Sequence, residues 1–150
     1  MNTKALTVLL MVCITIITCI VYITVLGNNK VVENPVEGIV LEIKESTITS
    51  TGLTLVIKNV APNGYCYGSH YRIDERVNGQ WVSKIPTSTV WTDELGILSK
   101  NSNREVELSW EWRYGELSPG NYRVVKDFAY LYLDRTNGDY YPISVEFTIN

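Results

Sequence analysis

Residues 106–128 read VELSWEWRYGELSPGNYRVVKDF, and this stretch decides the fold. In an extended strand, successive side chains point to opposite faces. One face of the expected strand is apolar or aromatic and consists of Val106, Leu108, Trp110, Trp112 and Tyr114. The opposite face is polar and consists of Glu105, Glu107, Ser109, Glu111 and Arg113. We therefore predict that Trp110 and Trp112 are core residues, not an exposed platform for a ligand.

A sharp corner is predicted directly after this strand. Pro119-Gly120 is a turn signal, and Tyr122 begins the next β-type segment. The spacing is similar to the tyrosine corner of Greek-key sandwiches, in which a Tyr hydroxyl bonds to the backbone a few residues upstream. Tyr122 is therefore interpreted as a structural residue and not as a catalytic acid.

Period-2 alternation continues through most of the chain after residue 38 and is interrupted by frequent turn signals. The predicted inward residues are Ile39, Leu41, Ile43; Leu53, Leu55, Ile57; and Tyr141, Ile143, Val145, Phe147, Ile149. Asn78-Gly79 and Asn137-Gly138 predict type I′ hairpins, while residues 86–103 read as an irregular edge and loop. The pattern predicts an all-β fold, an immunoglobulin-like antiparallel β-sandwich of about seven strands.

The N-terminal segment has a different composition, because residues 5–27 are uncharged and largely apolar. A helix of this length, rising about 1.5 Å per residue, covers a hydrocarbon core of roughly 30 Å. We predict one N-terminal hydrophobic helix in residues 1–27, which acts as a transmembrane anchor or signal segment. Residues 28–37 form a linker, and residues 38–150 form the sandwich.

The expected location is the cell membrane, with a single pass, the N-terminus in the cytoplasm and the folded domain outside. Two alternatives remain open. Residues 25–27 are a tolerable cleavage site for a signal peptide, which would give a secreted protein. Residues 16–19 resemble a lipoprotein signal, although Thr18 precedes Cys19.

Charge and cysteine content exclude several classes of protein. Lys4 and Lys30 are the only basic residues before residue 31, so residues 31–150 contain 11 basic and 16 acidic residues, a net charge of −5. There is no basic run, and we expect no nucleic-acid partner. Only Cys66 lies outside the apolar segment, which excludes a disulfide within the domain. Cys66 is expected to be a free thiol or to pair between chains.

Catalytic and metal sites are not expected. Cys66, His70 and Asp74 suggest a nucleophile–base–acid set, but residues four apart in a strand are separated by about 13 Å. Their parity predicts that all three point to solvent. One histidine and one cysteine do not make a zinc site of the usual spacing, and residues 134–139 lack the spacing of a calcium loop. We expect no cofactor and no enzymatic activity.

The segments TSTGLTLVIKN, YRIDERVNGQWVSK, ELGILSKNSNREVELSWEWRYGELSPGNYRVVKDF and YYPISVEFTI together resemble a family of bacterial immunoglobulin-like domains. The likeness runs from about residue 38 to residue 150. It is most distinctive at residues 52–55, 78–81, 110–115 and 117–122. Such domains occur in exported and membrane-anchored proteins, mainly of Gram-positive bacteria. The resemblance implies the fold and an extracytoplasmic location, and it brings no catalytic residues.

The remaining hypothesis is a non-catalytic binding or interaction module at the cell surface. Its partner would be a cell-surface protein or a wall component, and residues 5–27 would contact the membrane. Aromatic residues near loops and strand edges are the candidate interaction residues: Trp91, Tyr130, Tyr132 and Tyr140, together with the loop 87–103. The alternatives are a structural spacer in a membrane complex and a carbohydrate-binding protein.

Overall fold

The computed structural model describes residues 36–131 and 140–150. The chain divides into two units, residues 1–31 and 32–150, and the described residues belong to the second. The predicted anchor, most of the linker, Tyr132 and the Asn137-Gly138 turn lie outside the described residues. Within the described ranges, no helix has the length and apolar character needed to span a membrane.

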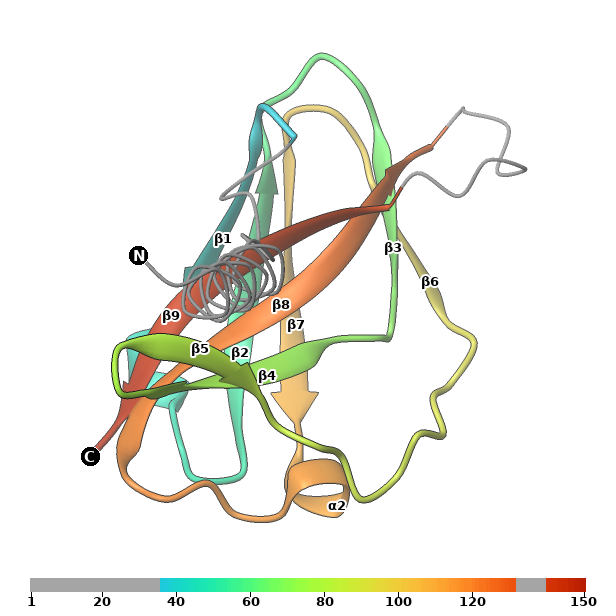
Figure 1. Cartoon of the computed structure of the whole chain (residues 1–150). Coiled ribbons are helices and arrows are strands. Elements are labelled where there is room, and N and C mark those ends of the chain that lie inside the picture. Colours follow the sequence, from blue (N-terminus) through green and yellow to red (C-terminus); the bar gives the residue numbers. More distant parts are fainter. Residues whose placement is uncertain (1–35, 132–139) are drawn as a thin grey trace, which may run out of the picture. The chain divides into compact units, whose positions relative to one another are not determined.

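Two antiparallel sheets form the domain (Figure 1). The smaller sheet has the order β1-β2-β7, with β1 at Ile39–Ile43, β2 at Gly52–Asn59 and β7 at Ser102–Ser109. The larger sheet has the order β5-β4-β8-β3-β6, and β9 pairs with β8. Its strands are β3 (Tyr65–Gly68), β4 (Arg72–Val77), β5 (Gln80–Ser83), β6 (Leu95–Leu98), β8 (Gly120–Tyr130) and β9 (Tyr141–Ile149). Two short helices, η1 (Glu45–Thr47) and α2 (Glu111–Tyr114), complete the described elements.

The predicted all-β sandwich is confirmed, with two differences in its strands. The region 86–103 is not wholly irregular, because residues 95–98 form β6 against β3. The segment before the first hairpin is divided into β3 and β4 by residues 69–71. These features account for a larger number of strands than predicted.

The core lies between the sheets and is built from the predicted inward faces. On β2 the three predicted residues, Leu53, Leu55 and Ile57, are buried. On β9 the buried members of the predicted face are Ile143, Phe147 and Ile149. The alternation of apolar and polar residues therefore predicted the buried face of β2 and β9, because one face of each strand packs against the opposite sheet.

The two tryptophans of the deciding stretch have different environments. Trp110 is fully buried, and its indole Nε1 donates a hydrogen bond of 2.8 Å to the Ser50 carbonyl. Trp112 is 52% exposed, so its predicted core position was wrong. The strand ends at Ser109, and the helical turn α2 changes the side-chain period from 2 to 3.6. As a result Arg113, which lies three residues after Trp110, points inward and is fully buried.

The predicted hairpin and corner are both confirmed. Asn78 and Gly79 connect β4 to β5 with φ angles of 52° and 81°, the positive values that a type I′ turn requires. Tyr122 is buried, and its hydroxyl donates a 2.8 Å hydrogen bond to the Ser118 carbonyl.

Replacing Tyr122 by Phe is expected to lower the free energy of unfolding by about 1 kcal/mol, because the ring remains and only one hydrogen bond is lost. Urea denaturation of the wild type and the variant measures the difference. A loss smaller than about 0.3 kcal/mol would show that the hydroxyl does not stabilise the corner.

Candidate functional site

A groove separates β6 from β7. The two strands are joined by a short turn at residues 99–101, but β6 pairs with β3 in the larger sheet and β7 pairs with β2 in the smaller one. The strands therefore diverge, as Figure 1 shows, and leave a hollow of about 550 Å³ between them. Residues 90–96 form one wall, and residues 106–109 form the other. This volume lies within the range of small-ligand pockets and is large enough for several side chains.

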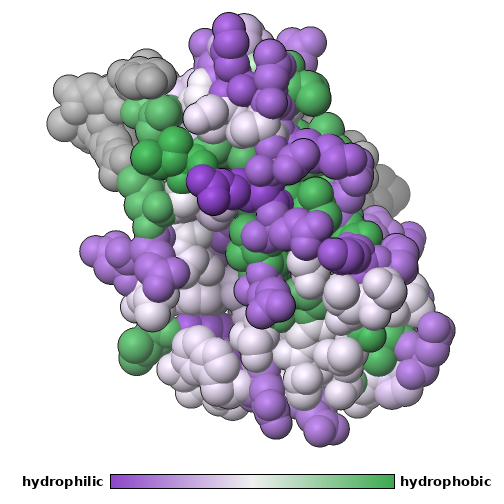
Figure 2. All heavy atoms as spheres, turned by 180° about the vertical axis from the view of Figure 1, so that it is seen from behind, coloured by the Kyte–Doolittle hydropathy of each residue, from purple (hydrophilic) through white to green (hydrophobic). Residues whose placement is uncertain are grey.

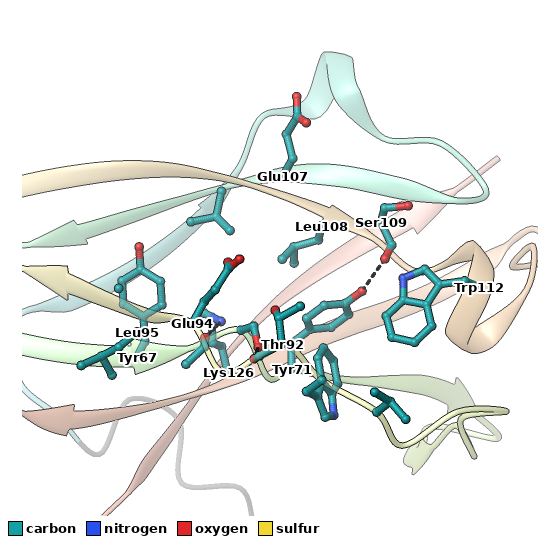
Figure 3. Close-up of a pocket in the computed structure, with 16 residues that line it drawn as sticks. Tyr67, Tyr71, Thr92, Glu94, Leu95, Glu107, Leu108, Ser109, Trp112 and Lys126 are labelled. Carbon is teal, nitrogen blue, oxygen red and sulfur yellow. Dashed lines mark hydrogen bonds between the residues drawn. The ribbon is translucent and has the colours of Figure 1, made fainter.

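Tyr67, Tyr71 and Lys126 also line the groove, as Figure 3 shows. The Tyr71 hydroxyl donates a 2.9 Å hydrogen bond to the Ser109 carbonyl and so connects the two sheets at one end of the groove. The Tyr67 ring packs directly over Gly96, where an added Cβ would lie 2.3 Å from the ring. A side chain at position 96 would therefore displace Tyr67 from the groove wall.

Lys126 occupies the break between β3 and β4. Its ammonium donates hydrogen bonds to the carbonyls of Gly68 (2.6 Å), the last residue of β3, and of His70 (3.2 Å), within the break. It also lies 5.0 Å from the centre of the Tyr67 ring. Burial lowers the pKa of Lys126 to about 8, and the nearby Asp127 carboxylate opposes this change.

A rise in stability with pH is expected from Lys126. Between about pH 8 and pH 10 the unfolded chain retains the lysine proton while the folded chain has lost it, so stability increases with pH. Lys126 is expected to contribute a rise of about 2 kcal/mol to the free energy of unfolding across this range, and buried tyrosines with raised pKa values oppose it as the pH nears 10. We therefore expect the rise to be seen in the difference between the wild type and Lys126→Met. Urea denaturation at both pH values tests this. Parallel changes in the wild type and the variant would contradict it.

Arg113 holds the loop that precedes β6. Its guanidinium lies between two indole rings, 3.3 Å from the centre of Trp91 and 4.3 Å from that of Trp112. It donates hydrogen bonds to the carbonyls of Ser88 and Val90. The Thr87 amide in turn donates to the Arg113 carbonyl over 2.7 Å. Together these contacts attach residues 87–91 to α2.

Sequence reasoning missed the role of Arg113, because strand parity placed it on the solvent face. The available signal was Gly115, which has a φ of 68° and directly follows α2. A glycine in this position is a common helix C-terminal signal.

The predicted interaction residues do not form one cluster in the described part of the chain. Trp91 lies in the wall of the groove, half-buried, with ring centres 4.4 Å from His70 and 5.1 Å from Tyr71. Tyr130 is half-buried at the end of β8, 4.8 Å from Tyr65 between ring centres. Tyr140, just before β9, is 62% exposed. Tyr132 lies outside the described residues.

The Cys66, His70 and Asp74 set is also divided, and the predicted solvent exposure of two of its members was wrong. Cys66 and Asp74 are buried, whereas His70 is exposed. His70 lies in the break between β3 and β4, where strand parity does not apply. Asp74 lies on β4, where Arg72 and Arg123 cover its carboxylate. Burial lowers the pKa of His70, and the Asp127 carboxylate partly offsets this effect.

Asp74 is fully occupied by structural contacts. It accepts hydrogen bonds of 2.8 Å from Arg72, Ser83 and Arg123. Burial alone would raise the pKa of Asp74, but these donors lower it below its usual value. The carboxylate therefore stabilises the pairing of β4, β5 and β8, and it does not orient His70.

Two antiparallel sheets packed face to face, with a tyrosine corner at the start of the long β8, define the class of immunoglobulin-like sandwiches. A model of the bacterial Ig-like domain matches residues 35–148. The chain belongs to this family, as the resemblance in its sequence predicted. The comparison with curated proteins gave no match.

Proposed function

We propose that this protein is a membrane-anchored, extracytoplasmic interaction module that binds a protein at the cell surface and does not catalyse a reaction. Family membership supports a domain of the immunoglobulin-like class. The uncharged segment 5–27 supports the anchor. The proposed binding site is the groove between β6 and β7.

One observation carries this proposal: large apolar side chains are exposed on both sides of the groove. Leu95 on the β6 side is 51% exposed, and Trp112 on the β7 side is 52% exposed. Figure 2, which views the domain from behind, shows apolar residues at the surface between charged ones. Apolar and aromatic side chains surrounded by polar residues are typical of protein interaction sites.

A carbohydrate site is less well supported, although Trp112 is exposed. Sugars stack on free aromatic faces, and the Trp91 ring already contacts both the Arg113 guanidinium and the His70 ring. Trp112 also contacts Arg113 through one face. A single accessible indole face is a poor platform for a sugar.

Site-specific photo-cross-linking on intact cells tests the binding function. The photoreactive residue p-benzoylphenylalanine is placed at Leu95 in the groove wall or, as a control, at Val82 on β5. These positions are matched, since the two side chains are 51% and 50% exposed. We expect a reproducible adduct with one protein at position 95 and none at position 82. Equal labelling at both positions, or adducts only with the chain itself, would favour a spacer.

The location is tested separately. Gln80 lies in the exposed part of the β4–β5 hairpin, and Cys66 is buried. A Gln80→Cys variant should react with a membrane-impermeant maleimide on intact cells and remain in the membrane fraction. Labelling that appears only after lysis would contradict the outside location.

A further inference from the structure

We propose that the groove binds an extended peptide segment of the partner, which adds as a strand to the outer edge of β7. Basic residues of this segment lie beside Glu105 and Glu107, and apolar residues that alternate with them enter the groove. This inference rests on the proposed function and names the chemistry of the partner.

The first support is the open edge of β7. Within residues 36–131 and 140–150, β7 is the last strand of the smaller sheet and pairs only with β2. The Trp110 amide continues this ladder and donates 2.9 Å to the Thr51 carbonyl. Because backbone groups alternate in direction along an antiparallel strand, even-numbered residues of β7 bond to β2. Glu105 and Glu107 therefore present their N–H and C=O groups to the open edge.

One end of the edge is already closed. The Ser109 carbonyl points to the same side as those of Glu105 and Glu107, and it accepts the hydrogen bond from Tyr71. A peptide strand would therefore pair at residues 105–107 and stop before Ser109. Edge strands with unpaired backbone groups are recognised by β-strand addition in several classes of binding domain.

The second support is charge, which disfavours a second copy of this chain as the occupant. In antiparallel self-pairing the outward residues of both strands must face each other. Registers centred on or between Glu105 and Glu107 place carboxylates opposite carboxylates. The register that pairs Asn103 with Glu105 places Arg104 opposite Arg104. Like charges directly opposite one another are destabilising, and the remaining registers overlap only the strand ends.

A partner strand with basic residues avoids the like-charge contacts that a second copy of β7 would make. Glu107 is exposed, points away from the groove in Figure 3, and forms no ion pair with the described residues. Glu105 forms an ion pair of 3.1 Å with Lys44, whose side chain is 50% exposed. A lysine or arginine beside Glu107 forms an opposite-charge cross-strand pair, which is stabilising.

The third support is the alternation of environments across β7. Val106 and Leu108 point from this strand into the groove, whereas the carboxylates face solvent. The pairing stretch 105–107 spans roughly 10 Å at about 3.3 Å per residue, which fits about three residues of an extended peptide. A strand in this position has alternate side chains near Leu108 and near the carboxylates. The recognised sequence therefore alternates apolar and basic residues.

Binding of a defined peptide tests the inference. The probe is fluorescein-labelled Lys-Val-Lys-Val-Lys-Val, measured by fluorescence anisotropy with the full-length chain in detergent micelles. Two variants are compared: Glu107→Pro, which loses both the carboxylate and the edge N–H, and Glu107→Thr, which loses the carboxylate but keeps the N–H. The Glu107 amide does not bond to β2, so proline at this position leaves the β2–β7 ladder intact.

We expect saturable binding to the wild type, about 3-fold weaker binding to Glu107→Thr and at least about 10-fold weaker binding to Glu107→Pro. A probe with N-methyl groups on alternate amides should also bind the wild type at least about 10-fold more weakly. This comparison does not depend on how the proline variant folds. Equal affinity of the two variants and of the two probes, or no saturable binding to the wild type, would overturn the inference.

The cross-linking experiment separates this inference from the proposed function. With the photoreactive residue at Leu95 and Glu107→Pro in the same chain, loss of the adduct supports strand addition. An adduct that persists shows a partner bound in the groove by another mode, which overturns the inference and leaves the proposed function intact. Absence of an adduct in the otherwise wild-type chain contradicts the proposed function itself.

Discussion

Replacing Arg113 by Ala is expected to lower the free energy of unfolding by about 3 kcal/mol. The substitution removes charge-assisted hydrogen bonds to the Ser88 and Val90 carbonyls and the contacts with two indole rings. It is also expected to detach residues 87–91 from α2, so that Trp91 becomes more accessible. Urea denaturation gives the loss of stability, and iodide quenching of tryptophan fluorescence gives the change in exposure.

Arg113→Lys is the control for charge. An ammonium keeps the charge but lacks the planar guanidinium, which packs against an indole ring while its separate N–H groups donate to two carbonyls. We expect this variant to lose most of the same stability and to show the same increase in quenching. An Arg113→Ala variant within about 1 kcal/mol of the wild type, with unchanged quenching, would show that Arg113 does not hold the loop.

Replacing Trp110 by Ala is expected to have the largest effect on stability, about 3–5 kcal/mol. Trp110 is fully buried, its ring centre lies 5.6 Å from that of Phe147, and its Nε1 donates to the Ser50 carbonyl. Truncation leaves a cavity between the sheets and removes one of the two hydrogen bonds to the Ser50 carbonyl, which also accepts from the Leu117 amide. Equilibrium urea denaturation measures the loss.

Trp112→Ala is the matched control, since it removes the same side chain two residues later. Trp112 is 52% exposed, so little core packing is lost, and the main change is the contact with Arg113. We expect a loss of about 1 kcal/mol. Similar losses for the two alanine variants would mean that both tryptophans pack in the core and that the helical turn is placed wrongly.

Strand parity predicted those parts of the fold in which one face of a strand meets the opposite sheet. Leu55 and Ile57 on β2 and Ile143 and Phe147 on β9 are examples. The Asn78-Gly79 hairpin and the Tyr122 corner were also predictable, because each rests on local chemistry. The turn requires residue types that tolerate a positive φ, such as Asn and Gly. A buried tyrosine needs a partner for its hydroxyl.

Two features depend on tertiary structure and could not be obtained from parity. The short helix α2 changes the period within the deciding stretch, and a single turn is too short to show a helical pattern in sequence. Asp74 was assigned to the correct face, but its burial depends on Arg72 and Arg123, and Arg123 lies far along the chain. Parity gives the face of a side chain and not what covers it.

The groove was not predictable, although residues 90–96, which form one of its walls, lie within the candidate interaction loop 87–103. The groove exists because β6 pairs with β3 instead of extending the smaller sheet beside β7. This choice of partner is a long-range property of the fold. Arg113 contributes to it by fixing the loop that leads into β6.

Amide hydrogen exchange at Glu107, measured by NMR with and without the Lys-Val-Lys-Val-Lys-Val peptide, tests the open edge of β7 most directly. Without the peptide, the Glu107 amide should exchange faster than the Val106 amide, which bonds to β2. A saturating concentration of the peptide should slow exchange of the Glu107 amide by at least about 10-fold and leave exchange of the Val106 amide nearly unchanged. A Glu107 amide that is already as protected as Val106, or that exchanges equally fast with the peptide bound, would contradict strand addition at β7.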